Sequence, residues 1–355
     1  MARSSFQHMQ VRGVVAVVPR HERCLDDEID LFGGDAAQIA RIKRTIGLDR
    51  RRVVQPGVTA ADLCESAARE LFKRLALEPG SIDAVINVTQ TPDYSQPANA
   101  CVLHGKLGLD KGCAAFDVNL GCSGYVYALW LAGLMVEGGA LRRVVVLAGD
   151  TISRIVHPRD RAVAPLFGDA GSATLVEYTE APRASWFTLN TDGKGCGHLI
   201  VPAGGFRQPA DESTCAEVTD AEGNVRSAET LYMNGAEVFN FSLREEPASV
   251  TDLCAWANKP LGSIDAFVFH QANRFILSNI ARKLKIPLEK VPMGTVEKYG
   301  NQSSASVPVA LCDGLGQQLV EAPATVLLSG FGVGLSWASC ILDQAQLACA
   351  EVIEY

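Results

Sequence analysis

Three residues in this chain could do chemistry, and the first is Cys122. It lies in the stretch 117–125 (DVNLGCSGY), where one apolar run ends at Leu120 and another begins at Tyr125. We expect a buried strand, a sharp glycine corner and then a buried helix. A cysteine at a helix start faces unpaired backbone amides and the positive end of the helix dipole, which stabilise a thiolate. The position therefore predicts a nucleophile of lowered pKa, although an ordinary buried cysteine would also fit.

The other two candidates are a histidine and an asparagine. His270 ends the apolar run 267–269 (FVF), and Asn301 lies in the polar stretch 299–306 (YGNQSSAS). A histidine that ends an apolar strand is more often structural than catalytic, and turn asparagines usually serve the backbone. Each is therefore a weak signal when taken alone.

An internal repeat connects these residues. The string GSIDAVINV at 80–88 returns almost unchanged as GSIDAFVFH at 262–270, displaced by 182 positions. The same displacement relates the apolar strand from 144 to the one from 326, and the Cys122 corner to residues 303–306. We interpret the chain as a duplicated α/β unit with halves at 1–185 and 186–355.

The repeat predicts where the three side chains meet. Buried strands alternate with amphipathic helices in both halves, which favours mostly parallel sheets covered by helices. Reactive groups gather at the carboxyl ends of such strands. His270 then faces Cys122 across the pseudo-dyad, and Asn301 offers an amide donor to the same centre. A Gly- and Pro-rich loop at 191–228 is expected to form a flap near this site.

Composition excludes several classes of protein. The 355 residues are 48% hydrophobic and 20% charged, enough for a core spanning two structural units. A net charge of −8 argues against a nucleic-acid binder. Eleven cysteines without a C-x-x-C pair fit neither a disulfide framework nor a zinc site. No signal-type segment or long apolar run is evident, so we expect a cytoplasmic protein that is not bound to a membrane.

The three contexts together resemble the β-ketoacyl-acyl carrier protein synthase III family of the thiolase-like superfamily. The resemblance covers essentially the whole chain and rests on strings in the family's order and spacing. These strings are DVNLGCSGYVYAL (117–129), HPRDRAVAPLFGDAGSATL (157–175), FHQAN (269–273), KYGNQSSASVPVAL (298–311) and GFGVGLSW (330–337). It implies a homodimer of αβαβα-layered subunits, in which a pantetheine arm reaches Cys122 through a tunnel.

The resemblance also implies the chemistry. Cys122 takes the acyl group from a thioester, and His270 and Asn301 stabilise the enolate formed when a malonyl thioester loses carbon dioxide. The backbone amides of Cys122 and Val333 form the oxyanion hole. Acyl carrier protein or coenzyme A thioesters are the implied substrates, and no metal or redox cofactor is required.

Further positions follow from the same resemblance. Arg44, Arg161 and Phe331 are expected to contact the substrate, and Gln96 is expected to cross the dimer interface and close the partner's acyl tunnel. A basic cluster after His270 is expected to dock the acidic carrier protein, and it consists of Arg274, Arg282 and Lys283.

The chain departs from the family pattern at several contacts for coenzyme A. No aromatic residue precedes Arg44 where a tryptophan stacks on adenine, Ala236 replaces an asparagine, and Phe275 replaces an arginine. Val333 stands where glycine is usual, but its amide remains. The thinned contacts favour a lipid-metabolic enzyme of a secondary pathway over the initiating enzyme of fatty acid biosynthesis.

Two other functions stay open. The first is an acyltransferase of the same fold, which would pass the Cys122 acyl group to an oxygen or nitrogen nucleophile without decarboxylation. The second is a silent partner subunit of a heterodimeric synthase, which the intact Cys, His and Asn make less favourable.

Overall fold

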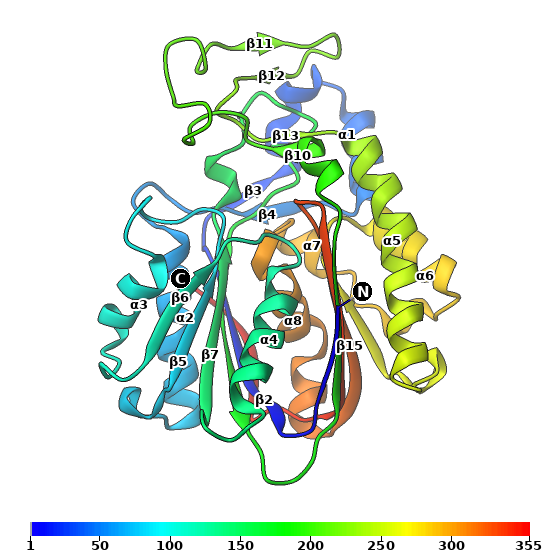
Figure 1. The fold of residues 1–355 in the computed structure, drawn as a ribbon. Coiled ribbons are helices and arrows are strands. Elements are labelled where there is room, and N and C mark those ends of the chain that lie inside the picture. The colour runs from blue at the N-terminus through cyan, green and yellow to red at the C-terminus, as the bar shows by residue number, and fades with distance from the viewer. Residues whose placement is uncertain (1) are drawn as a thin grey trace.

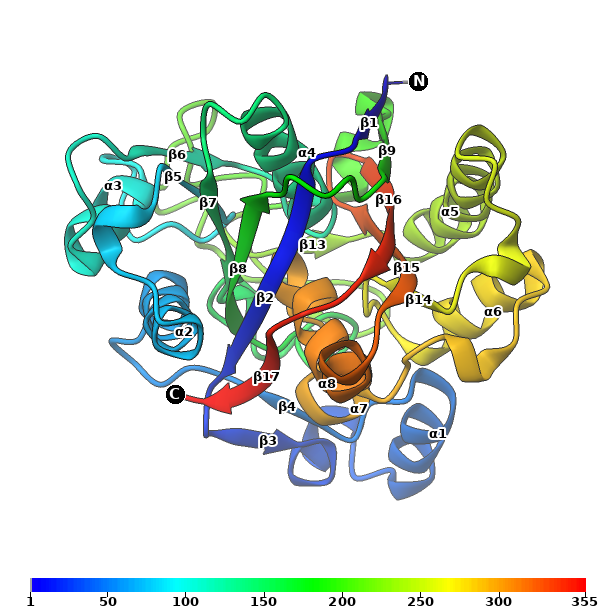
Figure 2. The ribbon, with the colours of Figure 1, turned by 90° about the horizontal axis from the view of Figure 1, so that it is seen from below.

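The computed structural model describes residues 2–355, which form five alternating layers of helices and sheets. Two sheets lie on either side of a central pair of helices, and further helices cover the outer face of each sheet (Figures 1 and 2). The predicted αβαβα architecture is confirmed. None of the helices in this described part is long and apolar enough to cross a membrane.

The first sheet has six strands. Their order is β17 (Cys349–Glu354), β2 (Met9–Val18), β8 (Ala170–Tyr178), β7 (Arg143–Asp150), β5 (Ala84–Val88) and β6 (Ala114–Val118). β5 pairs in parallel with both β6 and β7, whereas β8 runs antiparallel to β7 and β2. The carboxyl ends of β5, β6 and β7 therefore lie at one edge, as expected for strands that deliver residues to a common site.

The second sheet repeats this order when the first sheet is read from β5 toward β17. It consists of β14 (Ala266–Phe269), β15 (Ala324–Gly332), β16 (Ser336–Ala345), β9 (Ser185–Thr191) and β1 (Ala2–Phe6). β14 and β15 pair in parallel and β16 returns antiparallel, as β5, β7 and β8 do. The displaced string detected in the sequence thus marks β5 and β14, which occupy equivalent places.

The two chain ends join the opposite sheets. β1 pairs with β9 of the second sheet, and β17 pairs with β2 of the first (Figure 2). A division into two halves near residue 185 therefore remains a description of the repeat, because each sheet takes an edge strand from the other half.

The central layer consists of α4 (Gly124–Val136) and α8 (Ser306–Glu321). These helices start at the two corners that the repeat relates, and they pack between the sheets in one large apolar cluster. A helix covered on all sides needs no polar face, which explains the almost uninterrupted apolar sequence of α4.

The outer helices are amphipathic, as predicted. α2 (Ala60–Leu75) and α3 (Asn99–Leu107) pack on the first sheet, while α5 (Gly235–Trp256) and α6 (Arg274–Leu284) pack on the second. The start of α2 is a capping box, in which Thr59 and Asp62 each accept the other's backbone N–H.

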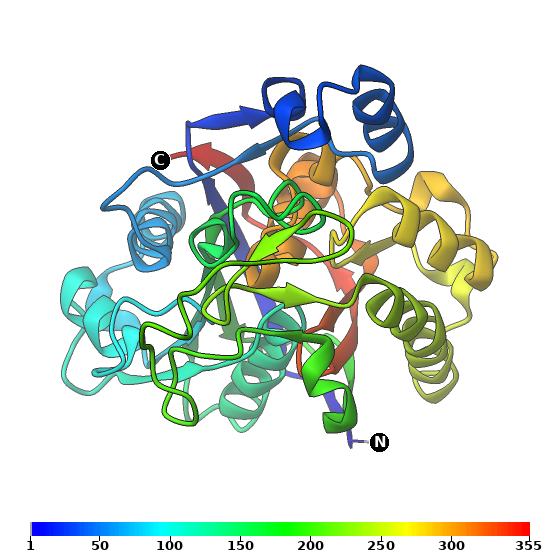
Figure 3. The same cartoon turned by 90° about the horizontal axis from the view of Figure 1, so that it is seen from above.

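The remaining elements gather at the end of the molecule that carries the site (Figures 1 and 3). They are α1 (Ala36–Ile46), β3 (Glu22–Cys24), β4 (Arg50–Arg52), α7 (Thr295–Tyr299), β10 (Leu199–Ile200), β11 (Val218–Thr219), β12 (Val225–Arg226) and β13 (Tyr232–Met233). Short 3₁₀ helices lie at Leu25–Phe32, Pro79–Ser81, Ile152–Arg154, Gly193–His198, Leu261–Ser263, Leu288–Lys290 and Ser303–Ala305.

Candidate active site

Cys122 lies at the corner between β6 and α4, two residues before the first helical residue. Its side chain is only 6% exposed, because the glycine-rich end of β15 lies flat against it. A Cβ on Gly332 would come within 2.7 Å of the Cys122 sulfur, and one on Gly330 would overlap the Cys122 carbonyl oxygen. The two glycines therefore let β15 of the second half reach the corner of the first.

The prediction of a lowered thiol pKa is wrong for this structure. Burial raises the pKa of Cys122 to about 12, and the nearby carboxylate of Asp150 adds to the increase. The nearby amide of Val333 and hydroxyl of Ser303 favour the thiolate and oppose this increase in pKa. Loss of hydration thus outweighs the favourable end of the helix, so the free protein holds a neutral thiol.

His270 follows β14, and its backbone N–H donates to the Ser329 carbonyl at 2.7 Å, which extends the pairing with β15. The ring meets Phe331 edge to face, with centroids 5.5 Å apart. Burial lowers the pKa of His270 to about 3, so the imidazole is neutral at physiological pH.

Ser306, the first residue of α8, orients the His270 ring. Its hydroxyl oxygen accepts the Gln271 backbone N–H at 2.8 Å and lies 2.8 Å from His270 Nδ1. Nδ1 is the one acceptor that the described residues offer to the Ser306 hydroxyl, so we assign the hydroxyl proton to the bond with Nδ1. The imidazole proton then resides on Nε2, which becomes a donor.

Asn301 is held by a segment from the first half of the chain. Its backbone N–H donates to the Leu166 carbonyl at 2.9 Å, and its carbonyl accepts the Gly168 N–H at 3.0 Å. A Cβ on Gly168 would overlap the backbone of Tyr299, so only glycine permits this approach.

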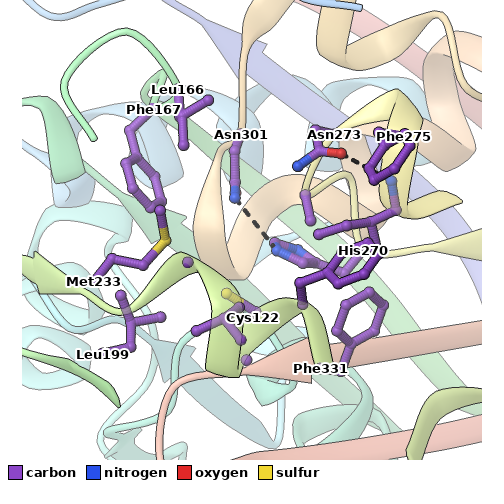
Figure 4. A pocket seen from close by; sticks show the side chains of 16 residues that line it. Cys122, Leu166, Phe167, Leu199, Met233, His270, Asn273, Phe275, Asn301 and Phe331 are labelled. Atoms are coloured by element: carbon purple, nitrogen blue, oxygen red, sulfur yellow. Dashed lines mark hydrogen bonds between the residues drawn. The ribbon is translucent and has the colours of Figure 1, made fainter. Parts of the chain in front are cut away.

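The side chain of Asn301 points at His270 (Figure 4). Its Oδ1 accepts the Ser303 backbone N–H at 2.9 Å, which turns Nδ2 toward His270 Nε2 at 3.4 Å. Two N–H donors from separate elements therefore lie side by side above the same space, and an oxygen placed there could accept from both.

That space is a cavity of about 150 Å³, here called the first cavity. Cys122, His270, Asn301 and Phe331 all line it (Figure 4). Most of its other lining is apolar and comes from 166–167, 199, 233–239 and 272–276. The structure thus brings the three predicted side chains together in one chamber.

Cys122 also lines a second cavity, of about 580 Å³. Val333 lies in this wall, together with Cys196, Ile200 and Ala203 from the loop that was expected to form a flap. The loop does cover the site, and Figure 3 shows it crossing the end of the molecule. Cys122 therefore lies between two chambers. Such a position suits a residue that holds a bound group in one chamber and meets a second reactant from the other.

Three predicted substrate contacts lie outside both cavities of this chain. Arg44 is exposed on α1, and Arg161 is half-buried and donates to the Glu222 carbonyl. Gln96 is exposed in the segment between β5 and α3. Their predicted roles remain predictions.

The basic cluster lies along α6, whose first turn lines the first cavity, while Arg282 and Lys283 lie in its last turn. Arg282 and Lys283 are exposed. Arg274 forms an ion pair with Glu297, and the carboxylate offsets the positive charge of Arg274. Phe275, where the resemblance expects an arginine, is 44% exposed and stacks on Phe239 with ring centroids 5.4 Å apart. Both rings line the first cavity, so its rim is more apolar than the resemblance implies.

Sequence reasoning missed three residues that organise the site, namely Ser303, Ser306 and Asp150. Asp150 is fully buried at the end of β7 and accepts the backbone N–H groups of Gln90 (2.8 Å) and Ser304 (3.2 Å). It thereby ties together two corners from different halves. Its place at the carboxyl end of a strand was the one available signal. Within residues 2–355, no group of three His, Cys, Asp or Glu is arranged to hold a metal ion.

Comparisons with known proteins agree with this geometry. Residues 116–195 match the family described as 3-oxoacyl-[acyl-carrier-protein (ACP)] synthase III, and residues 254–344 match its C-terminal part. A β-ketoacyl-[acyl-carrier-protein] synthase III of Caldanaerobacter subterraneus is 34% identical, over 83% of this chain and 86% of that protein.

Solved structures of proteins with related sequences are also similar to this chain. A 3-oxoacyl-(acyl-carrier protein) synthase from Burkholderia xenovorans superposes with a TM-score of 0.92 at 40% identity, covering 100% of this chain and 99% of that one. A β-ketoacyl-[acyl carrier protein] synthase III from Thermus thermophilus gives a TM-score of 0.78 at 31% identity, covering 94% and 98%.

Proposed function

Because the chain belongs to the 3-oxoacyl-[acyl-carrier-protein] synthase III family of condensing enzymes, we propose that it forms a carbon–carbon bond in two stages at Cys122. An acyl group is first transferred to the thiol, and a malonyl thioester then condenses with it after losing carbon dioxide. The observation that carries this proposal is the convergence of His270 Nε2 and Asn301 Nδ2, 3.4 Å apart, on the cavity that also contains Cys122.

The loading step exchanges one thiol for another, and the attacking species is the thiolate form of Cys122. The Cys122 sulfur attacks the thioester carbonyl, the bond to the leaving sulfur breaks, and the Cys122 proton ends on the departing thiol. One thiol is consumed and one is released, so a resting pKa of about 12 is compatible with the exchange. The amides of Cys122 and Val333, which lie near the sulfur, are the donors proposed for the carbonyl oxygen.

The condensing step needs donors for an enolate. When the malonyl carboxylate leaves as carbon dioxide, its electron pair moves toward the thioester oxygen. The N–H groups of His270 and Asn301 can both donate to that oxygen, and loss of one such donor typically costs about 3–4 kcal/mol of barrier. The enolate carbon then bonds to the Cys122 acyl carbon, and the Cys122 sulfur leaves and regains a proton from solvent.

The substrates are acyl and malonyl thioesters, with an acyl carrier protein as the partner. The exposed charges of Arg282 and Lys283 in the last turn of α6 support docking of an acidic carrier on this helix. Arg44 and Arg161 would contact the phosphate-bearing end of the thioester.

We also propose a homodimer. β6 ends the first sheet with an unpaired edge and partly exposed side chains. The neighbouring surface carries Tyr94, 58% exposed, and Leu134 on α4, 50% exposed. An open strand edge beside apolar side chains favours pairing with a second copy. Gln96 would then reach the partner's acyl chamber.

The experiment separates the two stages. His270→Ala and Asn301→Ala should still take up one acyl mass from an acyl thioester, measured on the intact protein, but should release carbon dioxide from malonyl thioester at least about 100-fold more slowly. Wild-type rates of decarboxylation in both variants would refute the condensing mechanism.

A further inference from the structure

The second cavity has two kinds of wall. Much of it is aliphatic, with Ile152, Ile155 and Leu231 among its members. Its polar side chains are Gln90, Asn119 and Ser303, and none of the lining residues that the structure describes is charged. A neutral cavity of this kind disfavours acyl groups that carry a carboxylate or an ammonium group.

The polar side chains gather beside the nucleophile. Relative to the point that a Cβ on Gly121 would occupy, Gln90 Oε1 lies at 2.5 Å and Ser303 Oγ at 3.3 Å. The Ser303 side chain also lies close enough to the Cys122 sulfur to lower its pKa, and Asn119 precedes that cysteine by three residues. Gln90 and Ser303 therefore lie beside Gly121, which precedes the nucleophile, in the same cavity wall as Cys122.

Backbone structure holds Ser303 in place. Its φ of 49° lies in the left-handed region, which residues other than glycine seldom adopt. The side-chain oxygen of Asn301 stabilises this conformation by accepting the Ser303 N–H at 2.9 Å. The backbone of Ser303 thus fixes the place of its hydroxyl in the wall of the second cavity.

The two amides offer complementary hydrogen-bonding groups. Gln90 Nε2 donates to Asn119 Oδ1 at 3.4 Å. Within residues 2–355, this leaves Gln90 Oε1 as an acceptor and Asn119 Nδ2 as a donor without protein partners. Both groups are open to solvent, since Asn119 is exposed and Gln90 is half-buried, but an acyl chain that enters the cavity would displace water from them. An alkyl chain cannot replace its hydrogen bonds, whereas a hydroxyl can accept from one amide and donate to the other.

We propose that the acyl group loaded on Cys122 carries a hydroxyl on its second or third carbon and an alkyl chain beyond it. The hydroxyl is read by Gln90, Asn119 and Ser303, and the chain lies against the aliphatic wall. This inference rests on the proposed function, because it concerns the group that the acyl-loading step transfers.

The test compares matched pantetheine thioesters in single-turnover acylation of the full-length protein, followed by intact mass. The panel contains octanoyl, 2-hydroxyoctanoyl and both enantiomers of 3-hydroxyoctanoyl groups. Two neutral hydrogen bonds predict that one hydroxylated substrate loads about tenfold faster than octanoyl. Gln90→Leu/Asn119→Leu should abolish this ratio, whereas Ser304→Ala should keep it, because Ser304 lines neither cavity.

Equal loading of all four substrates, or faster loading of octanoyl, overturns the inference while leaving the acyl-loading step intact. A ratio that survives in the double variant overturns the assignment of the reading residues. Failure of every thioester to load Cys122 refutes the proposed function itself, and the inference with it.

Discussion

Ser306→Ala should uncouple decarboxylation from acyl loading, because Ser306 touches neither sulfur nor substrate but determines which nitrogen of His270 carries the proton. Its hydroxyl lies 2.8 Å from His270 Nδ1 and 2.8 Å from the Gln271 backbone nitrogen. With a donor at Nδ1, the proton occupies Nε2, where it can stabilise an enolate.

The magnitude follows from two hydrogen bonds. In wild type, the Ser306 hydroxyl favours the Nε2–H tautomer by about 1 kcal/mol. In the variant that bond is gone, and the Asn301 amide, 3.4 Å from Nε2, can instead donate to an unprotonated Nε2 and favour the other tautomer by about 1 kcal/mol. The combined shift of about 2 kcal/mol inverts the tautomer ratio from about 5:1 to about 1:5, so the productive tautomer, and with it the rate of decarboxylation, falls about fivefold.

The assay measures carbon dioxide release from malonyl thioester and acylation of Cys122 in parallel. Acylation should change less than about threefold, and Ser306→Thr, which retains the hydroxyl, should restore decarboxylation. Ser304→Ala is the matched control, since that buried neighbour forms no side-chain hydrogen bond. ¹⁵N chemical shifts of His270 report the tautomer directly. Wild-type decarboxylation by Ser306→Ala, or an equal loss of both activities, would refute the reasoning.

Three other changes test separate parts of the structure. Burial raises the pKa of Glu246 from 4.5 to about 8, so the unfolded chain binds fewer protons than the folded one between these values, and stability falls as pH rises through this window. Glu246→Gln should remove that loss of stability, which is on the order of 3 kcal/mol at pH 7 and can be measured by urea unfolding. If the stability of the two proteins depends on pH in the same way, Glu246 is not the cause. Gly332→Ala should slow acylation at least about tenfold, because its Cβ would lie 2.7 Å from the Cys122 sulfur. Gly193→Ala, which has open space around it, should not slow acylation. Equal acylation rates for the two variants would contradict the packing at Cys122. Gln96→Ala should lengthen the preferred acyl chain in a series of thioesters, and an unchanged preference would remove Gln96 from the partner's acyl chamber.

Much of the site could be predicted because local sequence and a long repeat point to the same places. The near identity of 80–88 and 262–270 locates β5 and β14, and thereby His270 at the end of a strand. The glycine-flanked corner predicts the start of α4, and Thr59 predicts the start of α2. These features depend on residues that are close in the chain.

The rest depends on contacts between distant segments. The helix start at Cys122 is visible in the sequence, but the desolvation that raises its pKa comes from β15, some 200 residues away. Asp150 and Ser306 act through hydrogen bonds to corners elsewhere in the chain. The exchange of β1 and β17 between the sheets has no local signal, because an edge strand pairs with whichever edge the fold presents.

A single-turnover chase tests the central claim most directly. Cys122 is loaded with an acyl group, excess thioester is removed, and malonyl-carrier protein is added while acyl-enzyme, carbon dioxide and products are counted. The mechanism predicts one carbon dioxide and one 3-oxoacyl thioester for each acyl group lost from Cys122. Loss of the acyl group as an ester, an amide or a free acid, without carbon dioxide, would contradict it.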